Sequence, residues 1–122
     1  MKANAYGHGL QQLAPTAVAA GADYIGICTN PEATIIRNLG LDVKLLRLRM
    51  ALPQELQESI DSLNIEEQIG TIEAATYLSQ AGVKLGKKIP VHINIDTGMG
   101  RSGFFANQTE ELKQICGLPG ID

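Results

Sequence analysis

The fold is constrained most by an alternation of short apolar segments with longer segments that begin at helix-capping residues. Strands are expected at residues 22–28, 43–48, 65–69 and 89–96. Helices are expected at residues 31–39, from Pro53 onward, at 71–85 and at 108–116. Strands that alternate with helices over short connections predict an α/β fold with a parallel sheet.

Both ends of the chain depart from this regular pattern. Pro15 lacks the backbone donor that a helix interior needs, so the first helix is expected to begin near Ala14 or to kink there. The last residues, GLPGID, are expected to form the loop before a further strand. The alternation is therefore expected to continue beyond both ends.

A parallel sheet either stays open or closes into a barrel. Neither GHG at residues 7–9 nor GMGRSG at residues 98–103 matches the Gly-x-Gly-x-x-Gly motif of dinucleotide-binding open sheets. The expected fold is therefore a partial (β/α)₈ barrel of the TIM type. A full barrel typically needs about 250 residues, so this chain would hold about half of one.

Composition excludes several classes of protein. The 44% hydrophobic content is enough for a core, and the net charge of −3 argues against a general nucleic-acid binder. Cys28 and Cys116 are far apart, which predicts free thiols in a reducing cytoplasm rather than a disulfide or zinc site. No apolar stretch approaches the roughly 20 residues of a membrane span. We expect a soluble, cytoplasmic protein.

A cluster of basic residues has a simpler interpretation than a nucleic-acid-binding surface. Four of them follow one another closely along the chain: Arg37, Lys44, Arg47 and Arg49. We expect these side chains to be the solvated ends of one strand.

The strand at residues 89–96 carries the most informative pattern. His92, Asn94 and Asp96 share one face, although a strand covered on both sides should be apolar on both. At the carboxyl end of a barrel strand, inward polar residues usually belong to an active site. The alternative is a polar layer without chemistry. Arg101, in the glycine-rich loop that follows, suits a carboxylate or phenolate oxygen, although such loops also simply turn the chain.

The opening stretch, MKANAYGHG, also suits an active site at the carboxyl end of a barrel strand. Lys2 would lie at the carboxyl end of a first barrel strand, where a desolvated lysine can attack a carbonyl carbon and form a Schiff base. Ala3 and Ala5 leave room for a bulky group, and Tyr6 supplies a ring and a hydroxyl. The alternative is an exposed lysine at a disordered terminus.

Taken together, MKANAYGHG and DTGMGR (residues 96–101) resemble the alanine racemase family, and the resemblance runs along essentially the whole chain. This resemblance implies a bacterial, cytoplasmic, homodimeric pyridoxal 5'-phosphate enzyme that supplies D-alanine for the cell wall. It implies a (β/α)₈ barrel followed by a C-terminal β domain. Residues 1–122 would be the N-terminal part of that barrel, without the complete first strand, the later strands or the C-terminal domain.

The resemblance also implies roles for individual residues. Lys2 would carry the cofactor covalently and act as the base on one face of the substrate α-carbon. Tyr6 would contact the cofactor near its phosphate, and Arg101 would hold its phenolic oxygen and help to place the substrate carboxylate. His8 would have a supporting, structural role.

Departures from the family pattern limit these roles. Asn94 stands where most members have a lysine, often carbamylated, so a chloride ion is expected between Asn94 and Arg101. The tyrosine base of the opposite face would come from the partner's C-terminal domain, and neither Tyr24 nor Tyr77 matches its motif. The isolated chain is therefore expected to be inactive.

Substrate range and the state of the isolated chain remain open. DTGMGRSGF is similar to the alanine-specific branch, whereas LLRLR and SLNIEEQIGT are more similar to broad-specificity amino-acid racemases. A non-catalytic cofactor-binding remnant, another barrel with a Schiff-base lysine, and a purely structural domain also stay open as hypotheses. An open half-barrel would leave strand edges unpaired, so we expect self-association or a longer polypeptide.

Overall fold

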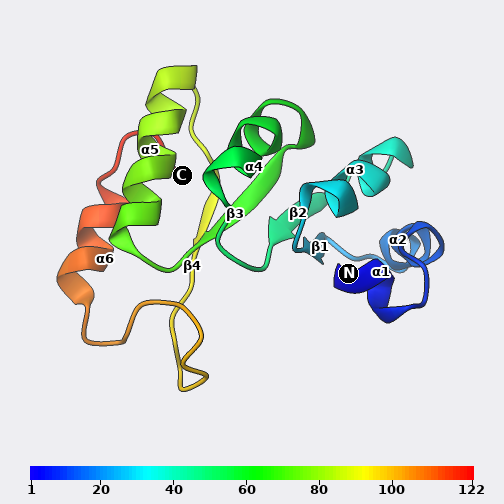
Figure 1. The fold of residues 1–122 in the computed structure, drawn as a ribbon, viewed down its shortest axis with the longest axis horizontal. Helices are drawn as coiled ribbons and strands as arrows, with labels where there is room; N and C mark the ends of the chain where they lie inside the picture. Colours follow the sequence, from blue (N-terminus) through cyan, green and yellow to red (C-terminus); the bar gives the residue numbers. More distant parts are fainter. The chain divides into compact units, whose positions relative to one another are not determined.

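A computed structural model describes residues 1–122, and Figure 1 shows its ribbon. The chain forms two compact units, Met1–Glu66 and Glu67–Asp122. Strands and helices alternate along the whole chain, and every strand pairing is parallel. The predicted α/β class is confirmed.

The first unit contains most of the helices. Its elements are α1 (Lys2–Tyr6), α2 (Leu10–Ala19), β1 (Tyr24–Ile27), α3 (Asn30–Asn38), β2 (Lys44–Arg47), α4 (Pro53–Glu58), the π-helical turn η1 (Ser59–Leu63) and the start of β3 (Ile65–Ile69). Strand β1 pairs with β2 from Tyr24 opposite Lys44 to Ile27 opposite Arg47. Strand β2 pairs with β3 at Leu45 opposite Ile65.

The second unit is built on the end of β3. It contains α5 (Ile72–Leu85), β4 (Val91–Ile93) and α6 (Thr109–Cys116). Strand β3 pairs with β4 from Glu67 opposite Val91 to Ile69 opposite Ile93. Ile89 and Ile95, on either side of β4, form isolated parallel bridges to Ile121 and Phe104. The last residues, predicted as a loop before a further strand, therefore already include one strand-like residue.

The core of the first unit lies between the sheet and its helices. Buried and exposed positions alternate along β1 and β2, so that only one face of each strand is covered. The buried set combines this face with one side of α2 and α3: Leu10, Ala14, Ile25, Ile27, Ala33, Ile36, Val43, Leu45, Leu63 and Ile65. Each buried Leu or Ile stabilises the fold by about 1.5–3 kcal/mol relative to exposure.

Helix α3 starts where the sequence predicts it. The Thr29 hydroxyl accepts from the Glu32 N–H at 3.4 Å, and the Glu32 carboxylate accepts from the Thr29 N–H at 3.2 Å. These two reciprocal bonds form a capping box, and they satisfy donors that a helix start otherwise leaves unpaired.

The expected start of the first helix near Ala14 is wrong. Helix α2 begins at Leu10, and Pro15 lies inside it rather than at its start. The Asn4 side-chain oxygen accepts from the Leu10 N–H at 2.8 Å and so caps the helix four residues earlier than expected. Leu10 and Ala14 are both buried on one face, and this burial outweighs the single hydrogen bond that Pro15 cannot make.

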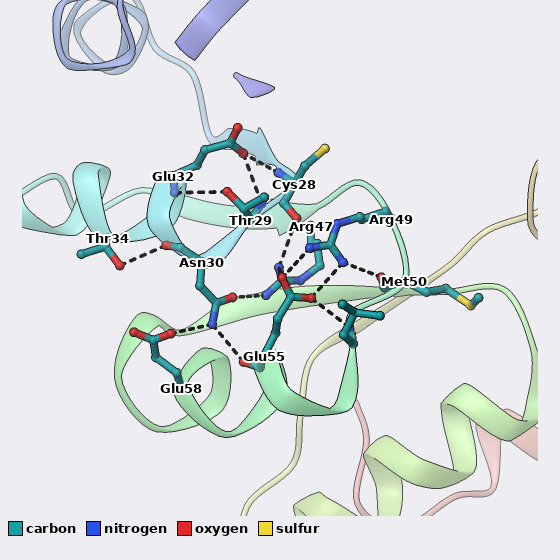
Figure 2. A network of polar contacts seen from close by, with 11 residues as sticks. Cys28, Thr29, Asn30, Glu32, Thr34, Arg47, Arg49, Met50, Glu55 and Glu58 are labelled. Atoms are coloured by element: carbon teal, nitrogen blue, oxygen red, sulfur yellow. Dashed lines mark hydrogen bonds and ion pairs between the residues drawn. The ribbon is translucent and has the colours of Figure 1, made fainter. Parts of the chain in front are cut away.

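The prediction of a solvated basic cluster is also wrong for Arg47, which is 0% exposed. Figure 2 shows its partners. Its guanidinium donates to the Cys28 carbonyl at 3.2 Å and to the Asn30 side-chain oxygen at 2.6 Å, and it lies 3.6 Å from the Glu55 carboxylate. Arg49 donates to the same carboxylate at 2.9 Å. A buried cation is tolerated here because anionic and carbonyl oxygens surround it.

Arg37 is half-buried, whereas Lys44 is exposed as expected. The Arg37 guanidinium donates to the carbonyls of Leu63 at 2.9 Å and Val43 at 2.8 Å. It thereby joins the end of α3 to the segments before β2 and β3. Both cysteines are free thiols, and no helix is long and apolar enough to cross a membrane.

We predict that Glu55→Ala lowers the free energy of unfolding by about 3 kcal/mol, because it removes the carboxylate that lies 3.6 Å from the buried Arg47 guanidinium. Urea denaturation monitored by circular dichroism measures this change. Asp23→Ala, which removes an exposed carboxylate of the same unit, serves as the control and should change stability by less than about 0.5 kcal/mol. Equal effects of the two substitutions would contradict a structural role for the contact between Glu55 and Arg47.

Candidate functional site

The backbone after Lys2 adopts a rare conformation. Ala3, Asn4, Ala5 and Tyr6 all have positive φ angles between 51° and 56°, so α1 is a left-handed turn. For residues other than glycine this conformation costs roughly 1–2 kcal/mol each. Lys2 therefore stands at the start of a strained turn. Such strain concentrates at functional sites, where surrounding contacts maintain it.

Several contacts hold the left-handed turn in place. The Ala3 N–H donates to the Glu32 carboxylate at 3.0 Å, and Asn4 caps α2 through its side chain. Ala5 is 3% exposed, and its N–H donates to the Met1 carbonyl at 3.2 Å. The Met1 amino group in turn donates to the Gly26 carbonyl of β1. The turn is thus attached to both α3 and the sheet.

The turn brings Lys2 and Tyr6 together. The Lys2 Nζ lies 5.8 Å from the centroid of the Tyr6 ring, and both side chains are exposed. No carboxylate of the same unit pairs with the Lys2 amine. An accessible amine beside a phenol is a donor set that fits an aldehyde cofactor, because the amine can form a covalent bond and the hydroxyl can hydrogen-bond to an anionic group.

His8 follows the turn, and its side chain is exposed. Its backbone N–H donates to the Ala5 carbonyl at 3.2 Å, which closes the turn. The contact comes from the backbone, so a supporting role for the His8 side chain stays a prediction.

Asn94 organises the glycine-rich loop of the second unit. Its Nδ2 donates to the Ser102 carbonyl at 2.6 Å, and its backbone bonds to Ile69 and Phe104, each at 2.8 Å. Gly103 has a φ of 124°, and a Cβ there would lie 2.7 Å from the Asn94 Nδ2. The loop can therefore approach Asn94 this closely only because residue 103 is glycine.

Arg101 lies in this loop, one residue before Ser102. Its side chain is exposed, and no carboxylate of its own unit pairs with it. The structure therefore brings Asn94 to the loop that carries Arg101, as it brings Lys2 to Tyr6 in the first unit. A guanidinium without a carboxylate partner can bind an external anion through several donors.

Asp96 shapes the same loop. Its Oδ1 accepts from the N–H of Gly98 at 2.8 Å and of Gly100 at 3.1 Å. These bonds, led by that from Gly98, hold the pKa of the Asp96 carboxyl below its ordinary value, because they stabilise the ionised form. The alternation along the strand predicts Asp96 on its polar face but does not predict that this side chain folds the loop.

We predict that the backbone amide resonances of Gly98 and Gly100 titrate together with a midpoint below about 3.9, the usual value for an aspartate. Because folding lowers this pKa, the contribution of these hydrogen bonds is fully present above the ordinary value and is lost as the pH falls through the folded one. NMR titration measures the midpoint, and Asp96→Asn should abolish the transition. A midpoint at or above the usual value would contradict the assignment.

Comparisons with known proteins identify relatives of this chain. A family model described as the N-terminal domain of alanine racemase matches residues 1–122. The alanine racemase of Clostridium perfringens is 39% identical over 124 residues, covering 100% of this chain and 32% of that protein. A broad specificity amino-acid racemase of Aeromonas hydrophila is 37% identical, covering 99% and 30%. The chain thus spans about a third of the length of the curated relatives it matches.

Solved structures share the fold. The alanine racemase of Clostridium difficile 630 has a TM-score of 0.90 at 30% identity, covering 99% of this chain and 32% of that one. The alanine racemase of Bartonella henselae, solved with covalently bound pyridoxal phosphate, has a TM-score of 0.80 at 25% identity, covering 98% and 34%. The expected partial (β/α)₈ barrel is confirmed. The chain belongs to the family of alanine racemase N-terminal domains.

Proposed function

We propose that this chain contributes the cofactor lysine and part of the barrel to a pyridoxal 5'-phosphate-dependent racemase that interconverts L- and D-alanine. The observation that carries the proposal is the exposed Lys2 amine, held beside Tyr6 by a left-handed turn. Within the family, residues 1–122 would form the N-terminal part of the barrel domain.

When bound, pyridoxal phosphate supplies an electron sink for the negative charge left on the substrate α-carbon. The Lys2 Nζ would hold the cofactor covalently and move the α-proton on one face of the substrate. The Tyr6 hydroxyl would donate to the cofactor phosphate. The Arg101 guanidinium would bind the phenolic oxygen and the substrate carboxylate, both of which suit its planar set of donors.

Racemisation needs a second proton-transferring group on the opposite face of the α-carbon. In the proposed enzyme this is a tyrosine from the partner subunit of a homodimer. Tyr24 does not match that role, since its hydroxyl accepts from Lys44 at 3.1 Å and donates to Glu66 at 3.2 Å. We therefore expect no racemase activity from residues 1–122 alone, where the chain would act as a cofactor-binding part.

We propose alanine as the substrate, with the cytoplasm as the location and cell-wall synthesis as the use of the product. A second candidate is a broad-specificity amino-acid racemase. Its support is the 37% identity to the Aeromonas hydrophila protein, which is close to the 39% identity to the Clostridium perfringens alanine racemase. The free thiols Cys28 and Cys116 are consistent with a reducing compartment.

We further propose that chloride binds beside Asn94 and Arg101. The Asn94 amide is neutral, and no carboxylate of the same unit offsets the charge of Arg101. A bound anion would neutralise that charge when the site closes around the cofactor, because an unpaired buried cation is costly.

We predict that pyridoxal phosphate followed by borohydride labels Lys2 selectively. The reduced adduct should appear in the Lys2 peptide by mass spectrometry, because an accessible amine without a carboxylate partner reacts with the aldehyde. Lys2→Ala should abolish the label, whereas Lys44→Ala, which removes another exposed lysine of the same unit, should leave it unchanged. Equal labelling of all exposed lysines would contradict the proposal.

We predict that chloride shifts the side-chain resonances of Arg101 and Asn94 in a saturable manner, and that gluconate does not. NMR titration of the chain measures this effect. Arg101→Ala should abolish the shift at Asn94, because it removes the charge that attracts the anion. Shifts that rise linearly with salt in both proteins would rule out a specific anion site.

A further inference from the structure

The two oxygens of the Glu32 carboxylate serve two different elements. Oε2 accepts from the N–H of Cys28 at 2.7 Å and of Thr29 at 3.2 Å, and Figure 2 shows both bonds at the start of α3. Oε1 accepts from the N–H of Ala3 at 3.0 Å, 29 residues away. One side chain therefore joins the start of α3 to the left-handed turn that follows Lys2.

The contact to Ala3 supplies a hydrogen-bond acceptor at the start of the turn. The first N–H groups of a helical turn have no partner within the turn, and α1 has no side-chain cap of its own. The Ala3 N–H belongs to the peptide bond that links Lys2 to Ala3. Glu32 supplies the missing acceptor at this end, whereas Asn4 and the buried Ala5 hold the far end.

The orientation of Lys2 depends on this peptide group. Ala3 has a φ of 51°, which is unfavourable for an alanine unless surrounding contacts enforce it. If Ala3 relaxed to a right-handed or extended conformation, the Lys2 side chain would move relative to the Tyr6 ring, now 5.8 Å from its amine. A fixed Ala3 N–H therefore fixes the starting point of the Lys2 side chain.

We propose that Glu32 is a positioning residue for Lys2. Through the Ala3 N–H it keeps the left-handed turn in the conformation that holds the Lys2 amine beside Tyr6. The proposal rests on the proposed function only in treating Lys2 as the cofactor lysine.

The two roles of Glu32 can be separated chemically. Capping α3 needs one acceptor, and glutamine provides one as well as glutamate does. Binding Ala3 at the same time needs a second acceptor, which only the carboxylate has, because the other end of a glutamine is an NH₂ donor. Glu32→Gln can therefore keep the cap and lose the contact to Ala3.

The matched control is Thr29→Ala. It removes the hydroxyl that accepts from the Glu32 N–H, so it weakens the cap of α3, but it leaves the carboxylate free to accept from Ala3. The stability of both variants is measured by urea denaturation. If the losses are comparable, any difference between the variants at Lys2 comes from the contact to Ala3. Glu32→Asp, whose shorter side chain cannot span both elements, is a second test variant should Glu32→Gln fail to fold.

The first readout is hydrogen exchange of the Ala3 amide, measured by NMR without cofactor. We expect Glu32→Gln to accelerate exchange at Ala3 by about tenfold, as for loss of one hydrogen bond to a charged acceptor, and Thr29→Ala to leave it nearly unchanged. The second readout is the rate at which pyridoxal phosphate and borohydride label Lys2. We expect Glu32→Gln to slow this rate by a similar factor while labelling at the exposed Lys44 stays constant.

The outcomes distinguish the two proposals. Faster exchange and slower labelling in Glu32→Gln, with neither in Thr29→Ala, would support the positioning role. Equal changes in both variants would show that Glu32 only caps α3, and no change in Glu32→Gln would overturn the role as well. If wild-type Lys2 is not labelled at all, the proposed function fails, and Ala3 exchange alone decides whether Glu32 holds the turn.

Discussion

The first unit depends on one buried charge. The Arg47 guanidinium lies at the carboxyl end of β2 and takes its oxygen partners from the ends of other elements: the Cys28 carbonyl after β1, the Asn30 side chain at the start of α3 and the Glu55 carboxylate of α4. A cation taken out of water is stable only while these partners stay in place. The contacts therefore fix the relative positions of two strands and two helices at the end where barrel enzymes place their active sites.

This charge is connected to the candidate cofactor lysine by a series of short contacts. Arg47 holds Cys28 and Asn30, and between them the Thr29 hydroxyl caps α3. Glu32 completes that cap and reaches the Ala3 N–H, next to Lys2. The turn that follows Lys2 is thus connected to the polar contacts around the buried Arg47. The arrangement explains how four successive residues remain in a left-handed conformation that is unfavourable for alanine and tyrosine.

The sequence predicted the order and type of the main elements because their signals are local. A capping residue at Thr29 or Asn30, followed by Pro31 and Glu32, predicted the start of α3, and short apolar segments predicted β1 and β2. The prediction of a solvated Arg47 was wrong because partners distant in the sequence bury and bind its side chain. The start of α2 lies at Leu10, whose N–H donates to the Asn4 side chain, and not near Ala14. The helix predicted from Pro53 is present as α4, and it continues into the π-helical turn η1, whose C-terminal cap Asn64 has a φ of 50°.

The candidate site was predictable only in part. The motifs identified Lys2, Tyr6, Asn94 and Arg101, and the structure places Lys2 beside Tyr6 and Asn94 against the loop of Arg101. Asp96 as the residue that folds this loop, and Glu32 as a partner of Ala3, were not apparent. A carboxylate with two oxygens can serve two groups at once, and the second group need not be near it in the sequence.

By itself, the sequence determined the alternation of parallel strands and helices, the helix caps and the residue types available for chemistry. These features depend on interactions within a few residues, so composition and spacing reveal them. Only the tertiary structure decided that Arg47 is buried and that Ala3–Tyr6 adopt the left-handed backbone conformation. Both states are unfavourable on their own, and each exists because groups 17 to 29 residues away supply the compensating hydrogen bonds.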